Sequence, residues 1–218
     1  MPDRAVNLTF HGVGTPVRPF DPGEAEVWVD RERFLSVLDS VAGRDDVRIT
    51  FDDGNASDVE LALPALQARG LRATFFVVAG RLGSPGFLDA AAVRELQAAG
   101  MTIGCHGMRH RPWRGLDERG LHEELVEAKH VLEDVTGAPV QEAACPFGSY
   151  DRKVLRFLRR SGYGHVYTSD RGMARPADWI QTRNTIHAED DPGVLEGLLA
   201  NRGRALRRRA KLAAKRWR

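Results

Sequence analysis

The chain has 218 residues and a formal net charge of +2, from 32 Lys and Arg against 30 Asp and Glu. That length suits one domain of the larger kind. The sequence contains no apolar run of the roughly eighteen residues that a membrane-spanning helix needs. Its two cysteines, Cys105 and Cys145, are too few for a disulfide framework. The first residues show no signal-peptide core, so we expect a cytoplasmic protein.

The basic residues are unevenly distributed along the chain. Nine Lys or Arg and no acidic residue lie between Arg202 and Arg218, which leaves 23 basic against 30 acidic residues elsewhere. We therefore expect one domain over residues 1–195 and a basic helix or tail over residues 196–218. Such a tail can contact anionic lipid at the inner membrane surface and, on weaker grounds, nucleic acid. A solvated helix that merely frays is the alternative.

Short apolar runs alternate with longer amphipathic ones. The short runs predict strands at Val6–Phe10, Val47–Phe51, Ala73–Val78, Thr102–Cys105, Glu142–Ala144, His165–Thr168 and Gln181–Ile186. The longer runs predict helices at Arg31–Val41, Ser57–Arg69, Asp89–Ala99, Asp117–Thr136 and Lys153–Ser161. This alternation favours parallel strands joined by crossover helices, in an open or distorted (β/α) barrel rather than a flat sheet. In such barrels the reactive residues follow the carboxyl ends of the strands.

Two adjacent carboxylates, Asp52 and Asp53, follow the second predicted strand. Their like charges repel in a partly desolvated site unless a cation or another partner stabilises them. Because neighbouring residues on an extended segment project in different directions, one carboxylate can bind a metal while the other faces the reactive water. Gly54 permits a sharp turn directly afterwards. A plain Asp-Asp-Gly turn is the alternative interpretation.

Two histidines, His106 and His110, follow the fourth predicted strand. Histidines four residues apart lie on one face of a helical turn and can bind one cation together. With Asp53 they supply two imidazoles and one carboxylate, which leaves positions open for water and substrate as in a catalytic metal site. Zn²⁺ is the first expectation for the metal, with Co²⁺, Ni²⁺, Mn²⁺ or Fe²⁺ as alternatives.

A tight turn follows the fifth predicted strand. Pro146 and Gly148 force this turn, which can bring a backbone N–H toward the metal as an oxyanion donor. The order Thr50–Gly54, then His106-x-x-x-His110, then Cys145–Gly148 resembles the polysaccharide deacetylases, also called NodB-homology proteins or carbohydrate esterase family four. The segments at Leu8–His11 and Ala73–Val77 resemble strands of the same family, so the resemblance runs from about residue 6 to about residue 190.

The resemblance implies a fold and a mechanism. The fold would be a distorted (β/α)₇ barrel, and the activity would be metal-dependent removal of acetyl groups from N-acetylated sugars. The metal would be held by Asp53, His106 and His110. Asp52 would be the general base, and the backbone N–H of Phe147, in the turn that Pro146 begins, would be the oxyanion donor. A divalent cation there would polarise the acetamide carbonyl and lower the pKa of a water molecule.

The chain departs from the family pattern at one position that bears on the base. Many members carry an arginine where this chain has Ala144, and that arginine orients the base. Arg183, on the last predicted strand, resembles an arginine that members with this kind of turn carry near their end. We therefore predict Arg183 as the partner of Asp52 in the site.

Three further residues have two interpretations each. His187, after the last predicted strand, is the candidate general acid, and a surface-loop histidine is the alternative. His11, at the end of the first predicted strand, either has a substrate-binding or supporting role in the site or merely ends the strand. Trp113, shortly after His110, is expected to stack on a sugar ring, with packing in the core as the alternative.

We predict a metal-dependent carbohydrate N-deacetylase that acts on an N-acetylated sugar or glycan precursor. One alternative keeps the metal but hydrolyses a non-sugar amide or a cyclic imide. Another is a catalytically silent glycan-binding relative. The intact set Asp52, Asp53, His106 and His110 speaks against a silent relative, because such proteins commonly lose metal ligands.

Overall fold

The structure is a computed structural model that describes residues 3–190, 193 and 196–197. Its centre is one sheet with the strand order β7-β1-β2-β3-β4-β5-β6-β8, and β9 also pairs with β1. The strands are β1 (Ala5–Phe10), β2 (Val47–Asp53), β3 (Ala73–Val77), β4 (Thr102–Cys105), β5 (Glu142–Ala144), β6 (His165–Thr168), β7 (Met173–Ala174), β8 (Ile180–Thr182) and β9 (Asn184–Thr185). The pairs from β1 to β6 are all parallel, as the alternation predicts.

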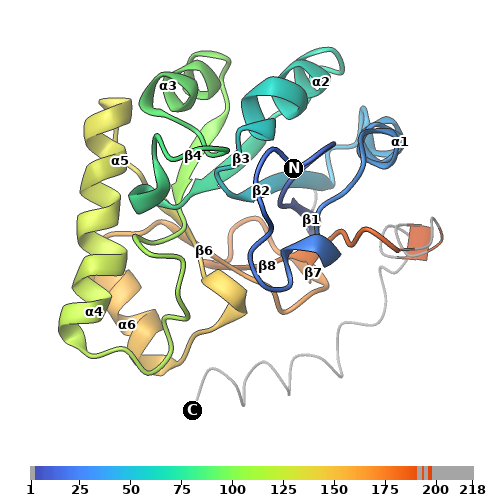
Figure 1. The fold of residues 1–218 in the computed structure, drawn as a ribbon. Helices are drawn as coiled ribbons and strands as arrows, with labels where there is room; N and C mark the ends of the chain where they lie inside the picture. Colours follow the sequence, from blue (N-terminus) through green and yellow to red (C-terminus); the bar gives the residue numbers. More distant parts are fainter. Residues whose placement is uncertain (1–2, 191–192, 194–195, 198–218) are drawn as a thin grey trace.

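The helices lie around the outside of the sheet, following the chain from α1 to α6 (Figure 1). They are α1 (Arg31–Val41), α2 (Leu63–Gln67), α3 (Ala90–Ala98), α4 (Glu118–His122), α5 (Ala128–Thr136) and α6 (Arg152–Arg160). Four of them begin after an aspartate whose side chain accepts a backbone N–H of the first turn, namely Asp30, Asp89, Asp117 and Asp151. Two predicted helices contain a π-helical turn, Asp58–Ala62 before α2 and Glu123–Glu127 between α4 and α5.

One short stretch nearly closes the sheet into a barrel. The predicted strand Gln181–Ile186 is in fact two short strands with different neighbours. β8 pairs in parallel with β6, and β9 pairs in parallel with β1 at the opposite end of the strand order. β7, which the apolar pattern did not predict, adds an antiparallel pair beside β1. The chain is therefore a single α/β domain with a nearly closed, barrel-shaped sheet, as predicted.

An aromatic cluster anchors the strand that carries the two aspartates. The rings of Phe10 and Phe34 meet edge to face at 5.1 Å, and those of Phe51 and Phe75 stack at 4.6 Å. All four side chains are almost completely buried. Burial of each contributes about 1.5–3 kcal/mol to folding. The cluster ties β1, β2, β3 and α1 together, so the end of β2 is held firmly.

Among the described residues, no helix is long and apolar enough to cross a bilayer. The basic run Arg202–Arg218 lies outside the described residues. The proposed contacts of that tail with a membrane surface or with nucleic acid therefore stay predictions.

Candidate metal centre

The two aspartates lie within β2 itself, whose last residue is Asp53. Asp52 is in register with Phe76 of β3, and Asp53 with Val77. Asp53 has a left-handed backbone, with φ of 78°, and Gly54 continues it with φ of 72°. The strand therefore ends abruptly, and both carboxylates are directed into the mouth of the barrel, where they line the same cavity.

Arg183 meets Asp52 where the sheet closes. It lies between β8 and β9, and its backbone N–H donates to the Thr168 carbonyl at 2.9 Å while its carbonyl accepts the Arg171 N–H at 2.9 Å. Its side chain is 1% exposed. Nη1 donates to Asp52 Oδ1 at 2.5 Å, and Nη2 donates to Oδ2 at 2.7 Å. The structure thus brings the two residues together in the bidentate geometry that suits an arginine–carboxylate pair.

The charges around Asp52 keep it ionised. Burial by itself would raise the pKa of this carboxyl. The Arg183 guanidinium and the nearby imidazoles of His106 and His11 outweigh burial and hold the pKa below its usual value. Asp52 is therefore an anion that can accept a proton.

His106 is anchored at the end of β4. Its backbone N–H donates to the Val77 carbonyl at 2.9 Å, and its ring Nδ1 lies 2.9 Å from the Ala144 carbonyl. Because a carbonyl can only accept, Nδ1 carries the proton and the neutral ring turns its Nε2 lone pair toward the cavity. Burial lowers the pKa of His106 to about 4, so the ring is neutral near pH 7. This is the form that binds a metal.

His110 reaches the site by a route that the sequence did not predict. Residues His106–His110 form an irregular loop and not a helical turn, so the expectation of one helical face was wrong. Gly107 with φ of 86° and His110 with φ of 50° bend the chain back on itself. His110 Nε2 then lies 3.0 Å from Asp53 Oδ1, and His106 Nε2 lies 3.6 Å from the same oxygen.

These three side chains fit a divalent cation. Asp53, His106 and His110 each offer one ligand atom, and these atoms all lie within 4.8 Å of one another. Asp53 Oδ1 is buried without a hydrogen-bond partner among the described residues. The lone pair of the neutral His106 ring faces this oxygen, so two acceptors oppose each other unless a cation lies between them. Two nitrogens and one oxygen suit Zn²⁺ and the neighbouring transition metals.

The electrostatics of Asp53 agree with this fit. Burial acts to raise the pKa of this carboxyl as well. The adjacent His110 ring, together with the electrostatic effect of the neighbouring imidazoles, outweighs burial and brings the pKa far below its usual value. Asp53 is thus an anion, which is the state that binds a metal.

A cavity of about 550 Å³ opens over these residues. Among the other predicted residues, His11, His187 and Phe147 line it. His11 Nε2 lies 4.0 Å from Asp52 Oδ2, and His187 is half-buried. Phe147 has a left-handed backbone with φ of 56°, and its ring is 4.7 Å from that of His110. Among the described residues the Phe147 N–H has no acceptor, so it is free to meet a ligand.

Two residues of the predicted substrate site lie outside this cavity. Pro146 is buried and only begins the turn that presents Phe147. Trp113 is fully buried in the core, and its Nε1 lies 3.4 Å from Glu124 Oε2. The prediction that Trp113 stacks on a sugar is therefore wrong, because the indole has no exposed surface and does not line the cavity.

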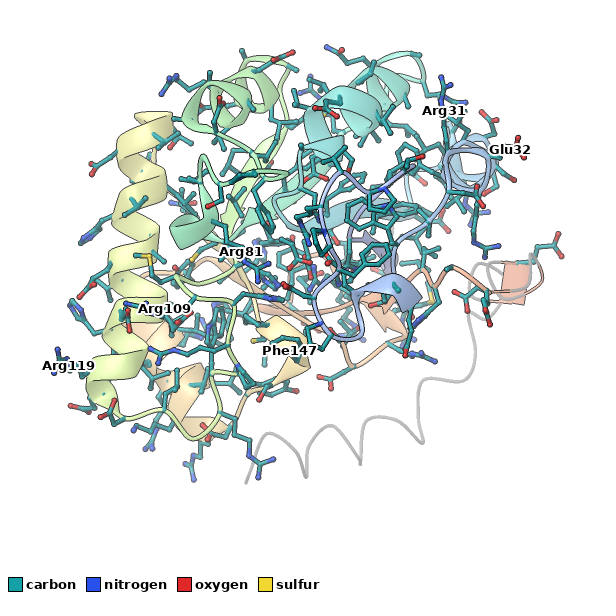
Figure 2. The ribbon with its side chains drawn as sticks, viewed as in Figure 1. Arg31, Glu32, Arg81, Arg109, Arg119 and Phe147 are labelled. Carbon is teal, nitrogen blue, oxygen red and sulfur yellow. The ribbon has the colours of Figure 1, made fainter. Side chains whose placement is uncertain are left out.

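The cavity also has lining residues that the sequence analysis missed. Arg81 and Ser169 come shortly after β3 and β6, so the strand-end rule could have found them. Figure 2 shows Arg81 and Phe147 near the middle of the face in view. Asp21, Glu24 and Val27 belong to the long segment between β1 and α1, which has no apolar pattern that would place it. Arg81 Nη2 donates to Asp21 Oδ2 at 2.5 Å and ties that segment to the barrel.

Several residues that line this cavity have a strained backbone conformation. Among the described residues, four non-glycine residues have positive φ: Asp53, His110, Phe147 and Arg171. The first three of them line the cavity. Such conformations cost about 1–3 kcal/mol each and persist where surrounding structure enforces them, most often at functional sites.

The chain thus has a barrel-shaped sheet with one carboxylate and two imidazoles gathered at the carboxyl ends of its strands. These features place it among barrel proteins with a candidate metal site at that end of the barrel. The family model for polysaccharide deacetylases matches residues 39–166, which is more than half of the chain. This chain belongs to the polysaccharide deacetylase family.

Relatives with known names agree with this membership. The Bacillus subtilis (strain 168) protein YxkH is 27% identical over 128 residues, covering 59% of this chain and 46% of that protein. A chitin deacetylase from Pestalotiopsis sp is 27% identical over 146 residues, covering 67% of this chain and 45% of that protein. The chain thus spans less than half the length of these curated relatives.

Solved structures share the fold. The Streptococcus pyogenes deacetylase PplD, solved in complex with acetate, superposes with a TM-score of 0.76 at 20% identity over 91% of this chain and 99% of that chain. IcaB from Ammonifex degensii gives a TM-score of 0.73 at 23% identity over 91% of this chain and 97% of that chain. At these identities the likeness establishes the barrel fold alone.

Proposed function

We propose that this chain is a metal-dependent hydrolase that removes the acetyl group from an N-acetylated saccharide. The observation that carries the proposal is the convergence of Asp53, His106 and His110 within 4.8 Å, beside the buried pair of Asp52 and Arg183. Membership of the polysaccharide deacetylase family supports it. So do the chitin deacetylase among the relatives and the acetate in the PplD structure.

Asp53, His106 and His110 would hold the metal, and Zn²⁺ is our first choice, with Co²⁺, Ni²⁺, Mn²⁺ and Fe²⁺ as alternatives. When bound, a divalent cation supplies Lewis acidity to the acetamide carbonyl and lowers the pKa of a water molecule. The protein's own contribution is to hold the ligands: His106 through the Ala144 carbonyl, and Asp53 through its place at the end of β2.

Asp52 would accept the proton of the attacking water as general base. Arg183 holds both of its oxygens, so the carboxylate cannot rotate away from the cavity. The same guanidinium keeps Asp52 anionic. It thereby takes over the orienting role that an arginine at position 144 has in many family members.

Two cavity groups would complete the reaction. The free N–H of Phe147 would donate a hydrogen bond to the oxygen that becomes negative when the carbonyl is attacked. His187 would protonate the departing amine, because it lines the cavity and, within the described part of the chain, forms no ion pair with Asp52 or Asp53. His11, by contrast, lies beside Asp52 and is more suited to support the base.

The test is acetate release from a panel of N-acetylated saccharides, with and without chelator, for the wild type and for Asp52→Asn. We expect chelator to abolish release and added Zn²⁺ to restore it. Asp52→Asn should lower kcat by about 10²–10⁴-fold, because general-base catalysis contributes about that much. Unchanged release in chelator would contradict the proposal.

Simple amides and a cyclic imide belong in the same panel. Turnover of these without acetate release from sugars would favour the amidase alternative. Binding of saccharides with no acetate release in the presence of metal would favour the silent glycan-binding alternative.

A further inference from the structure

The loop that carries both histidine ligands wraps around one buried carboxylate, that of Glu124. Glu124 lies in the π-helical turn Glu123–Glu127 and is completely buried. Its Oε2 accepts the backbone N–H of Met108 at 2.9 Å. Its two oxygens also lie 3.3 and 3.4 Å from the backbone N of Arg109. The Glu124 side chain therefore holds the backbone of Met108 and Arg109, the two residues before His110.

The polar groups that contact the Glu124 carboxylate in the described structure are all donors. Besides the two backbone N–H groups, Arg111 Nε donates to Oε1 at 2.7 Å, and Trp113 Nε1 lies 3.4 Å from Oε2. A carboxylate can accept all of these hydrogen bonds. An amide of the same shape would turn an NH₂ group toward at least one donor and leave buried groups unsatisfied.

The loop packs directly against this carboxylate. A Cβ added at Gly107 would meet Glu124 Oε2 at 2.3 Å, and Gly107 has φ of 86°. On the opposite side of the loop, the carbonyl of Met108 accepts the N–H of Gly80 at 3.1 Å. The Met108 residue is thus held from both sides, by Glu124 and by the segment after β3.

His110 depends on this arrangement more than His106 does. His106 has its own anchors in the Val77 and Ala144 carbonyls. The His110 ring contacts Asp53, His106 and Phe147, which are parts of the site itself. The position of its backbone, at φ of 50°, follows from where Met108 and Arg109 are held.

We propose that Glu124 is a positioning residue for the metal centre: it holds the His106–His110 loop in the shape that aims His110 at Asp53. This inference rests on the metal site of the proposed function and adds to it a residue that does not touch the metal. The π-helical turn agrees with the role, because such turns are often found at functional sites.

The matched control is Glu123, the neighbouring residue. Glu123 pairs with Arg109 and Arg111 of the same loop, but through their side chains at the surface. Its donors from the loop are the guanidinium groups of these two arginines. Glu123→Gln therefore removes charge from the same place without releasing the loop.

The experiment measures Zn²⁺ affinity directly, by competition of the chelator-treated protein with a chromogenic chelator. We expect Glu124→Gln to weaken Zn²⁺ binding by about 10–100-fold, as is typical when a group that orients a ligand is lost. Glu123→Gln should change the affinity by no more than about fivefold, because exposed ion pairs contribute little. Circular dichroism of each metal-free variant establishes that it is folded.

The outcomes separate the two levels of the proposal. Wild-type protein that binds no Zn²⁺ would overturn the proposed function itself. Wild type that binds Zn²⁺ while folded Glu124→Gln binds it equally well would overturn the role of Glu124 alone. If Glu124→Gln does not fold without metal, Glu124→Asp takes its place, because it keeps the charge but withdraws the carboxylate from the backbone N–H groups of Met108 and Arg109. Wild-type Zn²⁺ affinity in folded Glu124→Asp would also overturn the role of Glu124.

Discussion

The two halves of the candidate metal centre are held by different kinds of contact. Asp52 and Asp53 belong to β2, which pairs with β1 on one side and β3 on the other. His110 and Phe147 belong to loops, and their left-handed backbones are imposed by surrounding groups. The strand half, Asp52 and Asp53, is positioned by the repeating hydrogen bonds between neighbouring strands and by the aromatic cluster beneath them. The loop half is positioned by single side chains, of which the buried Glu124 is the clearest.

These two kinds of support predict which part of the site tolerates substitution. Loss of one contact in a ladder leaves its neighbours in place, so the strand half should tolerate changes around it. Loss of one anchor in a loop frees several residues at once. Variants of the strand half should therefore change chemistry, while variants near the loop half should change geometry.

The largest expected effect is that of Asp53→Asn. This change removes the charged ligand but keeps the shape of β2, so Zn²⁺ affinity should fall by more than about 100-fold, beyond what loss of an orienting group costs. Calorimetric titration with Zn²⁺ measures it. Asp52→Asn is the matched control, and it should still bind the metal while turnover is lost. Tight Zn²⁺ binding by Asp53→Asn would break the division of roles between the two carboxylates.

Arg183→Met should have the next largest effect. It leaves Asp52 as an uncompensated buried charge, which costs about 3–5 kcal/mol in the free energy of unfolding, measured in urea at neutral pH. The folded-state pKa of Asp52 is held low by Arg183, so the stabilisation is present above the usual carboxyl pKa and is lost as pH falls. Without Arg183 the folded-state pKa of Asp52 rises.

In Arg183→Met the acidic limb of the pH profile of kcat/KM should accordingly move to higher pH. Arg183→Lys, which keeps the charge but not the bidentate geometry, should show a smaller shift. An unchanged acid limb in the methionine variant would mean that Arg183 does not act on the base.

The smallest expected effect is that of Phe147→Ala. The ring is 64% exposed, so the free energy of unfolding should change by less than about 0.5 kcal/mol. The backbone N–H is retained, so kcat should stay close to that of the wild type. If the ring forms an apolar wall for the sugar, KM should rise roughly fivefold, for about 1 kcal/mol of lost apolar contact. Steady-state kinetics separate the two constants.

Phe20→Ala is the control for this prediction. Phe20 is another exposed phenylalanine, at 41%, but it does not line the cavity, so its loss should leave both constants unchanged. A fall in kcat for Phe147→Ala would show that the ring, and not only the N–H, is needed for chemistry.

Much of the fold could be predicted because its signals are local. The apolar runs at β1 to β6 and the capping aspartates before α1 and α3 depend on residues close in sequence, so their periodicity and hydrogen bonding can be read directly. The two-residue strand β7 and the break that separates β8 from β9 could not be predicted, since β7 and β9 are too short for a pattern of their own and are defined by their pairing with β1.

For the site, local sequence patterns identified the available groups: the carboxylates Asp52 and Asp53 and the imidazoles of His106 and His110, each at or just after the end of a strand of a parallel sheet. Parallel strands end at one edge, so these residues had to meet. Only the tertiary structure decided how they meet. It placed Arg183 on Asp52 by closing the barrel between β8 and β9, and it buried Trp113 against Glu124. Those contacts join residues far apart in the chain, and no local pattern encodes their geometry.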